Sequence, residues 1–210
     1  FNRKMSVRIK VCGLRRAEDV GVCVDAGVDF VGFIFTPLSP RYVEPSVVAG
    51  ISSGKALRVG VFVDQPVEEV RRVAEQARLD FVQLHGQESP EEASAIGAHR
   101  VIKAFWPSAM TPEEMTVQMA RYADACAYYL LDAGKGGGGH GTILSLACIK
   151  RLCPPRPFFL AGGLGAENVA EAVGEVAPFG VDLNSMLERA PGIKDAQKII
   201  AAVGAIRSMI

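Results

Sequence analysis

The sequence lacks the features that mark several large classes of protein. Its 210 residues carry 23 basic and 23 acidic side chains, so the formal net charge is zero. A neutral chain offers no electrostatic basis for binding nucleic acid or an anionic membrane surface. No uninterrupted apolar run approaches the roughly 20 residues that a membrane-spanning helix needs. The basic N-terminal region has no apolar signal core. We therefore expect a cytoplasmic protein that binds neither nucleic acid nor membrane.

Cysteine is scarce, and the spacing of the cysteines does not indicate a disulfide framework. The chain has five cysteines, an odd number, and no CxxC pair. This pattern argues against a disulfide scaffold and against a zinc site. Hydrophobic residues make up 49% of the chain, too large a share for a disordered protein. We expect a reduced globular domain over residues 5–210, with Met5 as the natural start and residues 1–4 as an added or disordered beginning.

Short apolar runs recur along the chain, and each is followed by a stretch with helical periodicity. The runs are rich in Val, Ile and Phe and are bounded by Gly, Pro or charge, as buried parallel strands are. They cover residues 8–12, 29–35, 58–63, 81–85, 100–105, 128–132, 157–161 and 180–183. Helices are expected over residues 66–77, 165–173 and 195–203, and after Ser89 and Thr111, each followed by proline at the first helical position. The second and sixth intervening segments are the least regular.

This alternation of strand and helix predicts an α/β fold with a parallel sheet. Eight strand–helix units predict a single-domain (β/α)8 TIM barrel with short loops. The competing arrangement is an open doubly wound sheet, which usually has fewer strands in this length and leaves two edges. In a barrel, the groups that carry chemistry lie at the carboxyl ends of the strands.

Two strand-end residues are candidates for moving protons. Cys12 is either a small core residue or a base, and a base requires the thiolate. Its ordinary pKa of about 8.5 would then have to be lowered by a cation, for which Arg41 is the candidate. Asp132 either braces the following glycine-rich loop or acts as a general acid. His85 either fills a structural role or lines the site.

Glycine-rich stretches follow the sixth and seventh runs. Residues 134–141 formally contain GxGxxG, but they follow the sixth strand rather than the first, so a dinucleotide site is poorly supported. A mobile loop or an amide-rich cradle for an anion fits better. Gly162 and Gly163 agree with the rule that barrels bind phosphate in the loops after strands seven and eight.

A series of short motifs runs in order over nearly the whole chain. They are KVCGL at 10–14, GFIF at 32–35, SPRYV at 39–43, VGVFV at 59–63, QLHG at 83–86, LLD at 130–132, AGGL at 161–164, ENV at 167–169, GVD at 180–182, PG at 191–192 and KD at 194–195. In this order they resemble the phosphoribosylanthranilate isomerase family of the tryptophan pathway.

The resemblance implies an Amadori rearrangement that needs no metal and no organic cofactor, performed by a monomer or homodimer on a small phosphorylated substrate. It implies that Asp132 is the general acid and Cys12 the general base. The substrate-binding residues would be Arg41, Gln83 and His85. The phosphate-binding residues would be Gly139, Gly141, Gly162, Gly163, Asn184 and Ser185.

The chain departs from the family pattern near the expected phosphate site. The usual GGTG or GGSG is GGHG at residues 138–141, and the usual Phe-Asp-Trp segment is replaced by LSL at 144–146. The usual DVSSGVE is DLNSMLE at 182–188, which places Met186 at a glycine position. A side chain there is expected to crowd the anion or to demand an unfavourable φ. Two alternatives therefore stay open: a diverged, non-catalytic barrel that binds a phosphorylated ligand, and an isomerase of another phosphosugar.

Overall fold

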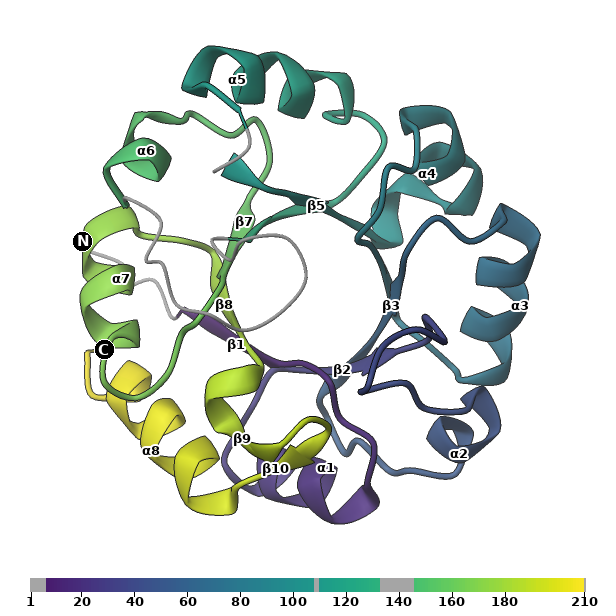
Figure 1. Ribbon diagram of the computed structural model, residues 1–210, viewed down its shortest axis with the longest axis vertical. Helices are drawn as coiled ribbons and strands as arrows, with labels where there is room; N and C mark the ends of the chain where they lie inside the picture. The colour runs from purple at the N-terminus through teal and green to yellow at the C-terminus, as the bar shows by residue number, and fades with distance from the viewer. Residues whose placement is uncertain (1–6, 108–109, 133–145, 210) are drawn as a thin grey trace.

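The computed structural model describes residues 7–107, 110–132 and 146–209, and in this part of the chain eight parallel strands close into a barrel (Figure 1). The strands are β1 Arg8–Val11, β2 Phe30–Ile34, β3 Leu57–Phe62, β4 Phe81–Leu84, β5 Val101–Phe105, β6 Tyr128–Asp132, β7 Phe158–Ala161 and β8 Gly180–Leu183. Each pairs with the next, and β8 pairs with β1 from Arg8↔Gly180 to Val11↔Leu183. This closure confirms the predicted TIM barrel and excludes the open sheet.

The helices form an outer ring around the strands (Figure 1). They are α1 Ala17–Asp25, α2 Pro45–Ala49, α3 Val67–Gln76, α4 Pro90–Ile96, α5 Pro112–Arg121, α6 Leu146–Arg151, α7 Val169–Val176 and α8 Ala196–Arg207. The helix α2 has only five residues, in agreement with the irregular second segment of the sequence. No helix in the described ranges is long and apolar enough to cross a membrane.

The helix starts follow directly from the sequence. Ser89 accepts a hydrogen bond from the amide of Glu92, whose carboxylate accepts one from the amide of Ser89, so α4 opens with a complete capping box. Thr111 and Glu114 form the same pair at the start of α5. In both helices proline occupies the first position, where no amide donor is needed.

The barrel interior is a packed core rather than a channel. Phe30, Val59, Ile102, Leu130 and Phe159 are buried inside the ring of strands. The rings of Phe30 and Phe159 meet edge to face at 5.3 Å. A larger apolar cluster fills the space between the strands and the helices. Because apolar side chains fill the interior, the polar chemistry is confined to the barrel's end.

Two details of the fold differ from the sequence prediction. A short antiparallel pair, β9 Glu188–Ala190 and β10 Ile193–Lys194, lies between β8 and α8 and was not expected. The helix α7 begins at Val169, four residues after the predicted start at 165. Asn168 explains the delay, because its side chain accepts a hydrogen bond from the amide of Gly165 and donates one to the carbonyl of Gly163, closing a turn before the helix.

Candidate active site at the barrel mouth

Polar side chains gather where the strands end. Strand alternation directs Lys10, Gln83 and Asp182 into the barrel, and all three are buried. Asp132 ends β6 in register with Ala161, which is in turn in register with Asp182. We call the residues around Cys12, the predicted base, the base side: Lys10, Cys12, Arg41, Asp182, Glu188 and Lys194. We call the residues around Asp132, the predicted acid, the acid side: Gln83, His85, Trp106 and Asp132.

The base side is centred on a buried ion pair next to the thiol of Cys12. The ammonium of Lys10 lies 2.9 Å from a carboxylate oxygen of Asp182, and the Lys10 side chain is fully buried. Cys12 is also buried, at 4% exposure. Gly32 makes room for it, because a Cβ at that position would lie 3.0 Å from the Cys12 sulfur. The thiol therefore sits in a closed, ionic environment rather than in an apolar core.

The pKa values on the base side reflect burial opposed by charge. Burial raises the pKa of the Cys12 thiol above its ordinary value, while Lys10, the nearest cation, acts in the opposite direction. Burial acts to lower the pKa of Lys10, but Asp182 and Cys12 outweigh it, and the net pKa is raised. Lys10 is therefore charged at neutral pH and available to stabilise a thiolate.

Arg41, the cation expected from the sequence to act on Cys12, also forms an ion pair with Glu188. The guanidinium of Arg41 is held by Glu188 through two hydrogen bonds, of 2.9 and 2.7 Å. Lys10 and Lys194 lower the pKa of Cys12 against the larger effect of burial. The pKa of Arg41 is raised by Glu188 and, to a smaller extent, by Cys12, so Arg41 also acts electrostatically on this thiol. These bonds fix the orientation of the planar Arg41 guanidinium at the barrel mouth, and such a group can bind a carboxylate through two hydrogen bonds.

Glu188 and Lys194 extend this network beneath the loop that follows β8. The ammonium of Lys194 lies 3.0 Å from Glu188 and donates to the carbonyl and the side-chain oxygen of Asn184 at 3.0 and 2.9 Å. Burial alone would raise the pKa of Glu188, but Arg41 and Lys194 hold that pKa below its usual value. The β9–β10 pair thus ties the loops after β2 and β8 together.

The acid side has a different character. An oxygen of Asp132 lies 3.5 Å from Nε2 of His85, and the two side chains are 24% and 26% exposed. The side-chain nitrogen of Gln83 lies 2.9 Å from Nδ1 of His85. The Trp106 ring meets the imidazole perpendicularly, with the ring centres 5.2 Å apart. His85 is therefore held on three sides and faces the predicted acid.

A second buried ion pair supports the loop that carries His85. Lys103 of β5 lies 2.8 Å from Glu88 and also donates to the carbonyl of Gly86 at 2.7 Å. Glu88 accepts hydrogen bonds from the amides of Asp64 and Gly86. These contacts fix the loop after β4 to the ends of β3 and β5.

The predicted phosphate residues fall into two groups. Gly162 and Gly163 adopt φ values of 102° and 65°, which only glycine adopts readily, and a Cβ on Gly163 would point into open space. Ser185 begins a short 3-10 helix, Ser185–Leu187, directly after β8. Within the described ranges, the amides of Gly163 and Ser185 donate to no backbone acceptor. Gly139 and Gly141, like His140 and residues 144–145, lie outside the described residues.

Met186 does not strain the backbone as the sequence led us to expect. Among the described non-glycine residues, positive φ values occur at Asp64, Arg78 and Ala177, and Met186 is not one of them. Its side chain is 48% exposed and lies against Gly165, where an added Cβ would come within 3.1 Å of the Met186 Cβ. Gly165 compensates for the larger residue.

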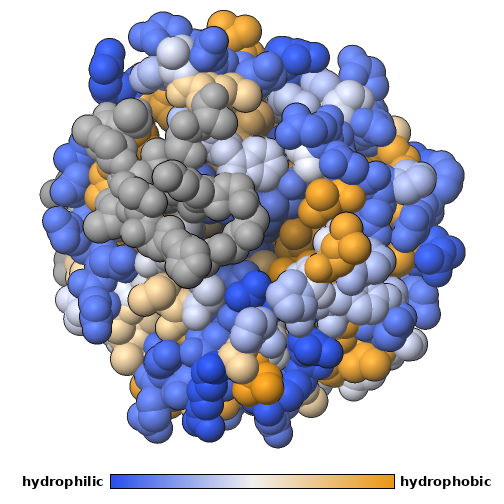
Figure 2. All heavy atoms as spheres, viewed as in Figure 1, coloured by the Kyte–Doolittle hydropathy of each residue, from blue (hydrophilic) through white to orange (hydrophobic). Residues whose placement is uncertain are grey.

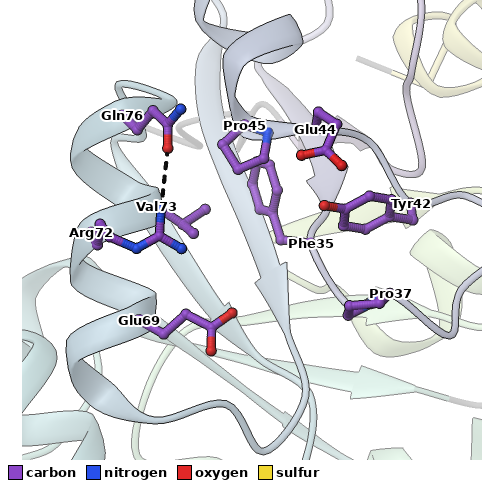
Figure 3. Close-up of a pocket in the computed structure, with 9 residues that line it drawn as sticks. All are labelled: Phe35, Pro37, Tyr42, Glu44, Pro45, Glu69, Arg72, Val73 and Gln76. Atoms are coloured by element: carbon purple, nitrogen blue, oxygen red, sulfur yellow. Dashed lines mark hydrogen bonds between the residues drawn. The ribbon is translucent and has the colours of Figure 1, made fainter.

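A cavity in the described part of the chain lies away from the mouth. It has a volume of about 230 Å³ and lies between α3 and the segment leading into α2, lined by residues that include Phe35, Tyr42 and Arg72 (Figure 3). None of the predicted site residues lines it. On the mouth's rim, Figure 2 shows an apolar patch beside the loop that follows β2, and this loop carries Leu38, which is 97% exposed.

Sequence reasoning did not assign a site role to Lys10, Asp182, Trp106 or Lys194. A lysine and an aspartate inside buried strands are the signals that would have found the Lys10–Asp182 pair, since buried charges occur in partnerships. Lys10 also precedes Cys12 by two positions, so strand alternation places both on one face. Lys194 has no such signal, because its strand was not predicted.

Comparison with known proteins gives a consistent result. A family model described as N-(5'-phosphoribosyl)anthranilate (PRA) isomerase matches residues 9–205. The isomerase of that name from Desulfovibrio desulfuricans is 50% identical over 196 residues, which cover 93% of each chain. The solved enzyme from Thermus thermophilus is 37% identical with a TM-score of 0.85, covering 97% of this chain and 100% of that one.

A further solved phosphoribosyl anthranilate isomerase has a small molecule bound. It is 34% identical, has a TM-score of 0.81 and covers 96% of this chain and 99% of that one, and it is in complex with reduced 1-(o-carboxyphenylamino)-1-deoxyribulose 5-phosphate. The barrel, the ordered motifs and these matches agree, and the chain belongs to the N-(5'-phosphoribosyl)anthranilate isomerase family.

Proposed function

We propose that this isomerase of tryptophan biosynthesis converts N-(5'-phosphoribosyl)anthranilate to 1-(2-carboxyphenylamino)-1-deoxyribulose 5-phosphate with Cys12 as general base and Asp132 as general acid. The observation that carries the assignment is the placement of the two groups. Cys12 directly follows β1 and Asp132 ends β6 of one barrel, with β8 and β7 between the two strands, so a substrate across the mouth has one group on each side. An aldose–ketose shift needs a proton delivered at one atom and removed from another.

The first step is ring opening. Asp132 donates its proton to the furanose ring oxygen, the bond between that oxygen and C1 breaks, and the nitrogen lone pair forms a protonated Schiff base. Asp132 is left as a carboxylate. It faces Nε2 of His85 at 3.5 Å, and a hydrogen bond from this nitrogen would stabilise the carboxylate as it forms.

The second step is loss of the proton on C2. The Cys12 thiolate accepts this proton, the C–H electrons form the C1–C2 double bond, and the Schiff-base nitrogen recovers its lone pair, which gives an enolamine. Tautomerisation to the ketone completes the reaction. Lys10 supports the thiolate electrostatically from within the barrel, where a charge interaction is screened less than in water.

The remaining contacts follow the shape of the substrate. Gly162, Gly163, Asn184 and Ser185, with Gly139 and Gly141, are proposed to hold the phosphate, largely through backbone amides. Two of the N–H groups of Arg41 bind Glu188, and the guanidinium has further donors for the anthranilate carboxylate. The backbone at Met186 has no positive φ, so backbone strain there gives no support to the alternative of a non-catalytic barrel.

The test is consumption of phosphoribosylanthranilate followed by its fluorescence. We expect a rate proportional to enzyme concentration, with Cys12→Ala and Asp132→Asn as inactive controls whose circular dichroism matches that of the parent protein. Absence of turnover by the folded parent protein would contradict the proposal. Turnover by both controls at the parent rate would contradict the residue assignment.

A further inference from the structure

We propose that Gln83 is a positioning residue that sets the tautomer of His85, so that the Nε2–H group faces Asp132. The proposal deepens the proposed function and rests on Asp132 being the acid. It changes the role expected for Gln83 from the resemblance, which was direct contact with the substrate.

The location of Gln83 favours an indirect role. Its side chain is 1% exposed, in the interior of β4, and its one recorded hydrogen bond within the described ranges joins its Nε2 to Nδ1 of His85 at 2.9 Å. An amide NH2 group can only donate, so Nδ1 must accept and carries no proton. A neutral imidazole then has its proton on Nε2, the nitrogen that lies 3.5 Å from Asp132.

The second observation is an unpartnered atom. Within the described part of the chain, the side-chain oxygen of Gln83 is buried and has no hydrogen-bond partner. Burying a carbonyl in this way is unfavourable, and an apolar residue of the same size would avoid it. The retention of an amide here is explained if its NH2 group serves His85.

The surroundings keep the imidazole in one orientation. Trp106 meets its ring perpendicularly at 5.2 Å, which hinders rotation of the ring. The Lys103–Glu88 pair fixes the next residues, since Lys103 donates to the carbonyl of Gly86 and Glu88 accepts from its amide. Because these contacts already fix the position of the His85 imidazole, Gln83 determines its tautomer.

The tautomer decides where the proton of Asp132 lies. If Nε2 carries a hydrogen, it donates to the nearer oxygen of Asp132, and the acidic proton is then carried by the other oxygen. If Nε2 carries a lone pair, it accepts the proton of Asp132, which is then directed away from the substrate. A wrong tautomer at an otherwise intact site is known to be costly in catalytic triads.

Nitrogen-15 NMR of the histidine side chains tests the proposal directly. The chain has three histidines, and the signals are assigned by their loss in His99→Asn and His140→Asn. At a pH where the imidazole is neutral, we expect an unprotonated Nδ1 and a protonated Nε2 in His85. Exposed His99 gives the averaged reference shift. A protonated Nδ1 in the parent protein would overturn the proposal.

Two substitutions of similar size separate the tautomer from the packing. Gln83→Glu places an acceptor at Nδ1 and should move the proton there, and Gln83→Met removes the donor without adding an acceptor. We expect kcat to fall by about a hundredfold in Gln83→Glu and about tenfold in Gln83→Met, within the range that acid catalysis supplies, with KM nearly unchanged. The matched control is Gln65→Leu, which removes hydrogen bonds to Phe35 and Glu69 elsewhere.

The outcomes distinguish this inference from the proposed function. If the parent protein has no turnover, the proposed function fails, whereas the NMR measurement still decides the tautomer. If the parent protein turns over and Gln83→Glu keeps both its kcat and the Nε2–H signal, only the inference fails. If the Gln83 variants lower KM and kcat together, and Gln65→Leu lowers them to the same extent, the effect is not specific to the tautomer and the inference is contradicted.

Discussion

Cys12 and Asp132 lie at strand ends of the same barrel, but the base side and the acid side surround them differently. The base side holds buried ions: the Lys10–Asp182 pair is almost fully enclosed, and Glu188 binds both Arg41 and Lys194. On the acid side, Asp132 and His85 are about a quarter exposed, and the partner of His85 is the neutral amide of Gln83.

The difference matches what the two proposed roles require. A base that acts as a thiolate needs positive charge nearby, because burial alone raises its pKa. An acid has to keep its proton until the substrate takes it, and a nearby cation would favour the carboxylate too early. The two halves of the mouth therefore use opposite electrostatics, with the cations Lys10 and Lys194 on the base side.

The largest effect should come from removing the proton-carrying groups. Cys12→Ser and Asp132→Asn are each expected to lower kcat by at least about a hundredfold, because acid–base catalysis typically supplies 10²–10⁴-fold. Steady-state fluorescence kinetics measure this loss. A control is Cys153→Ser, which changes an exposed cysteine and should leave kcat unchanged. A near-parental rate in either variant would show that its side of the mouth is not catalytic.

The pH profile tests whether the base side carries an ionising thiol. The pKa of Cys12 is raised by burial, so the thiolate is a minor species at neutral pH and its fraction grows as pH rises. We expect log kcat/KM to rise with a slope near one between pH 7 and 9, because kcat/KM reports ionisations of the free enzyme. In Lys10→Met the rise should move to higher pH, since a cation that lowers this pKa is lost. A profile that is flat over this range in the parent enzyme would contradict a thiol base.

Stability should separate the buried ions of the base side from surface ions. Lys10→Met leaves Asp182 buried without its partner and should lower the free energy of unfolding by about 3–5 kcal/mol. The exposed pair Arg71–Glu68, with side chains 49% and 83% exposed, is the matched control, and Arg71→Met should cost less than about 1 kcal/mol. Urea unfolding followed by circular dichroism measures both. If both variants lose the same free energy of unfolding, the buried Lys10–Asp182 pair contributes no more to stability than an exposed ion pair.

The strands and helix starts were easier to predict from the sequence than the charged contacts of the site. The strands were predictable because apolar runs report burial on both faces, and the starts of α4 and α5 because Ser89 and Thr111 are local capping signals. Cys12, Asp132 and His85 were proposed as site residues because chemistry in a barrel lies at strand ends, and the structure places all three at that end of the strands. The charges around Cys12 were predicted only in part: Arg41 was expected, but Lys10 and Lys194 were not. The Arg41–Glu188 contact joins residues 147 apart, and no local pattern reports such a pairing.

The smallest effect is expected where the two sides meet the phosphate loops. If backbone amides hold the phosphate, the side chain at position 186 should matter little, and Met186→Gly should change KM by less than about threefold. Its main effect should be a loss of about 1 kcal/mol in the free energy of unfolding, because glycine adds freedom to the unfolded chain.

Gly163→Ala is the contrasting variant. The added Cβ would meet open space, but the φ of 65° at this position disfavours alanine by about 1 kcal/mol or more. We expect a higher KM there, from a displaced amide. Substrate KM and inhibition by inorganic phosphate measure both variants. A large KM change in Met186→Gly with none in Gly163→Ala would place the phosphate contacts on the side chains instead.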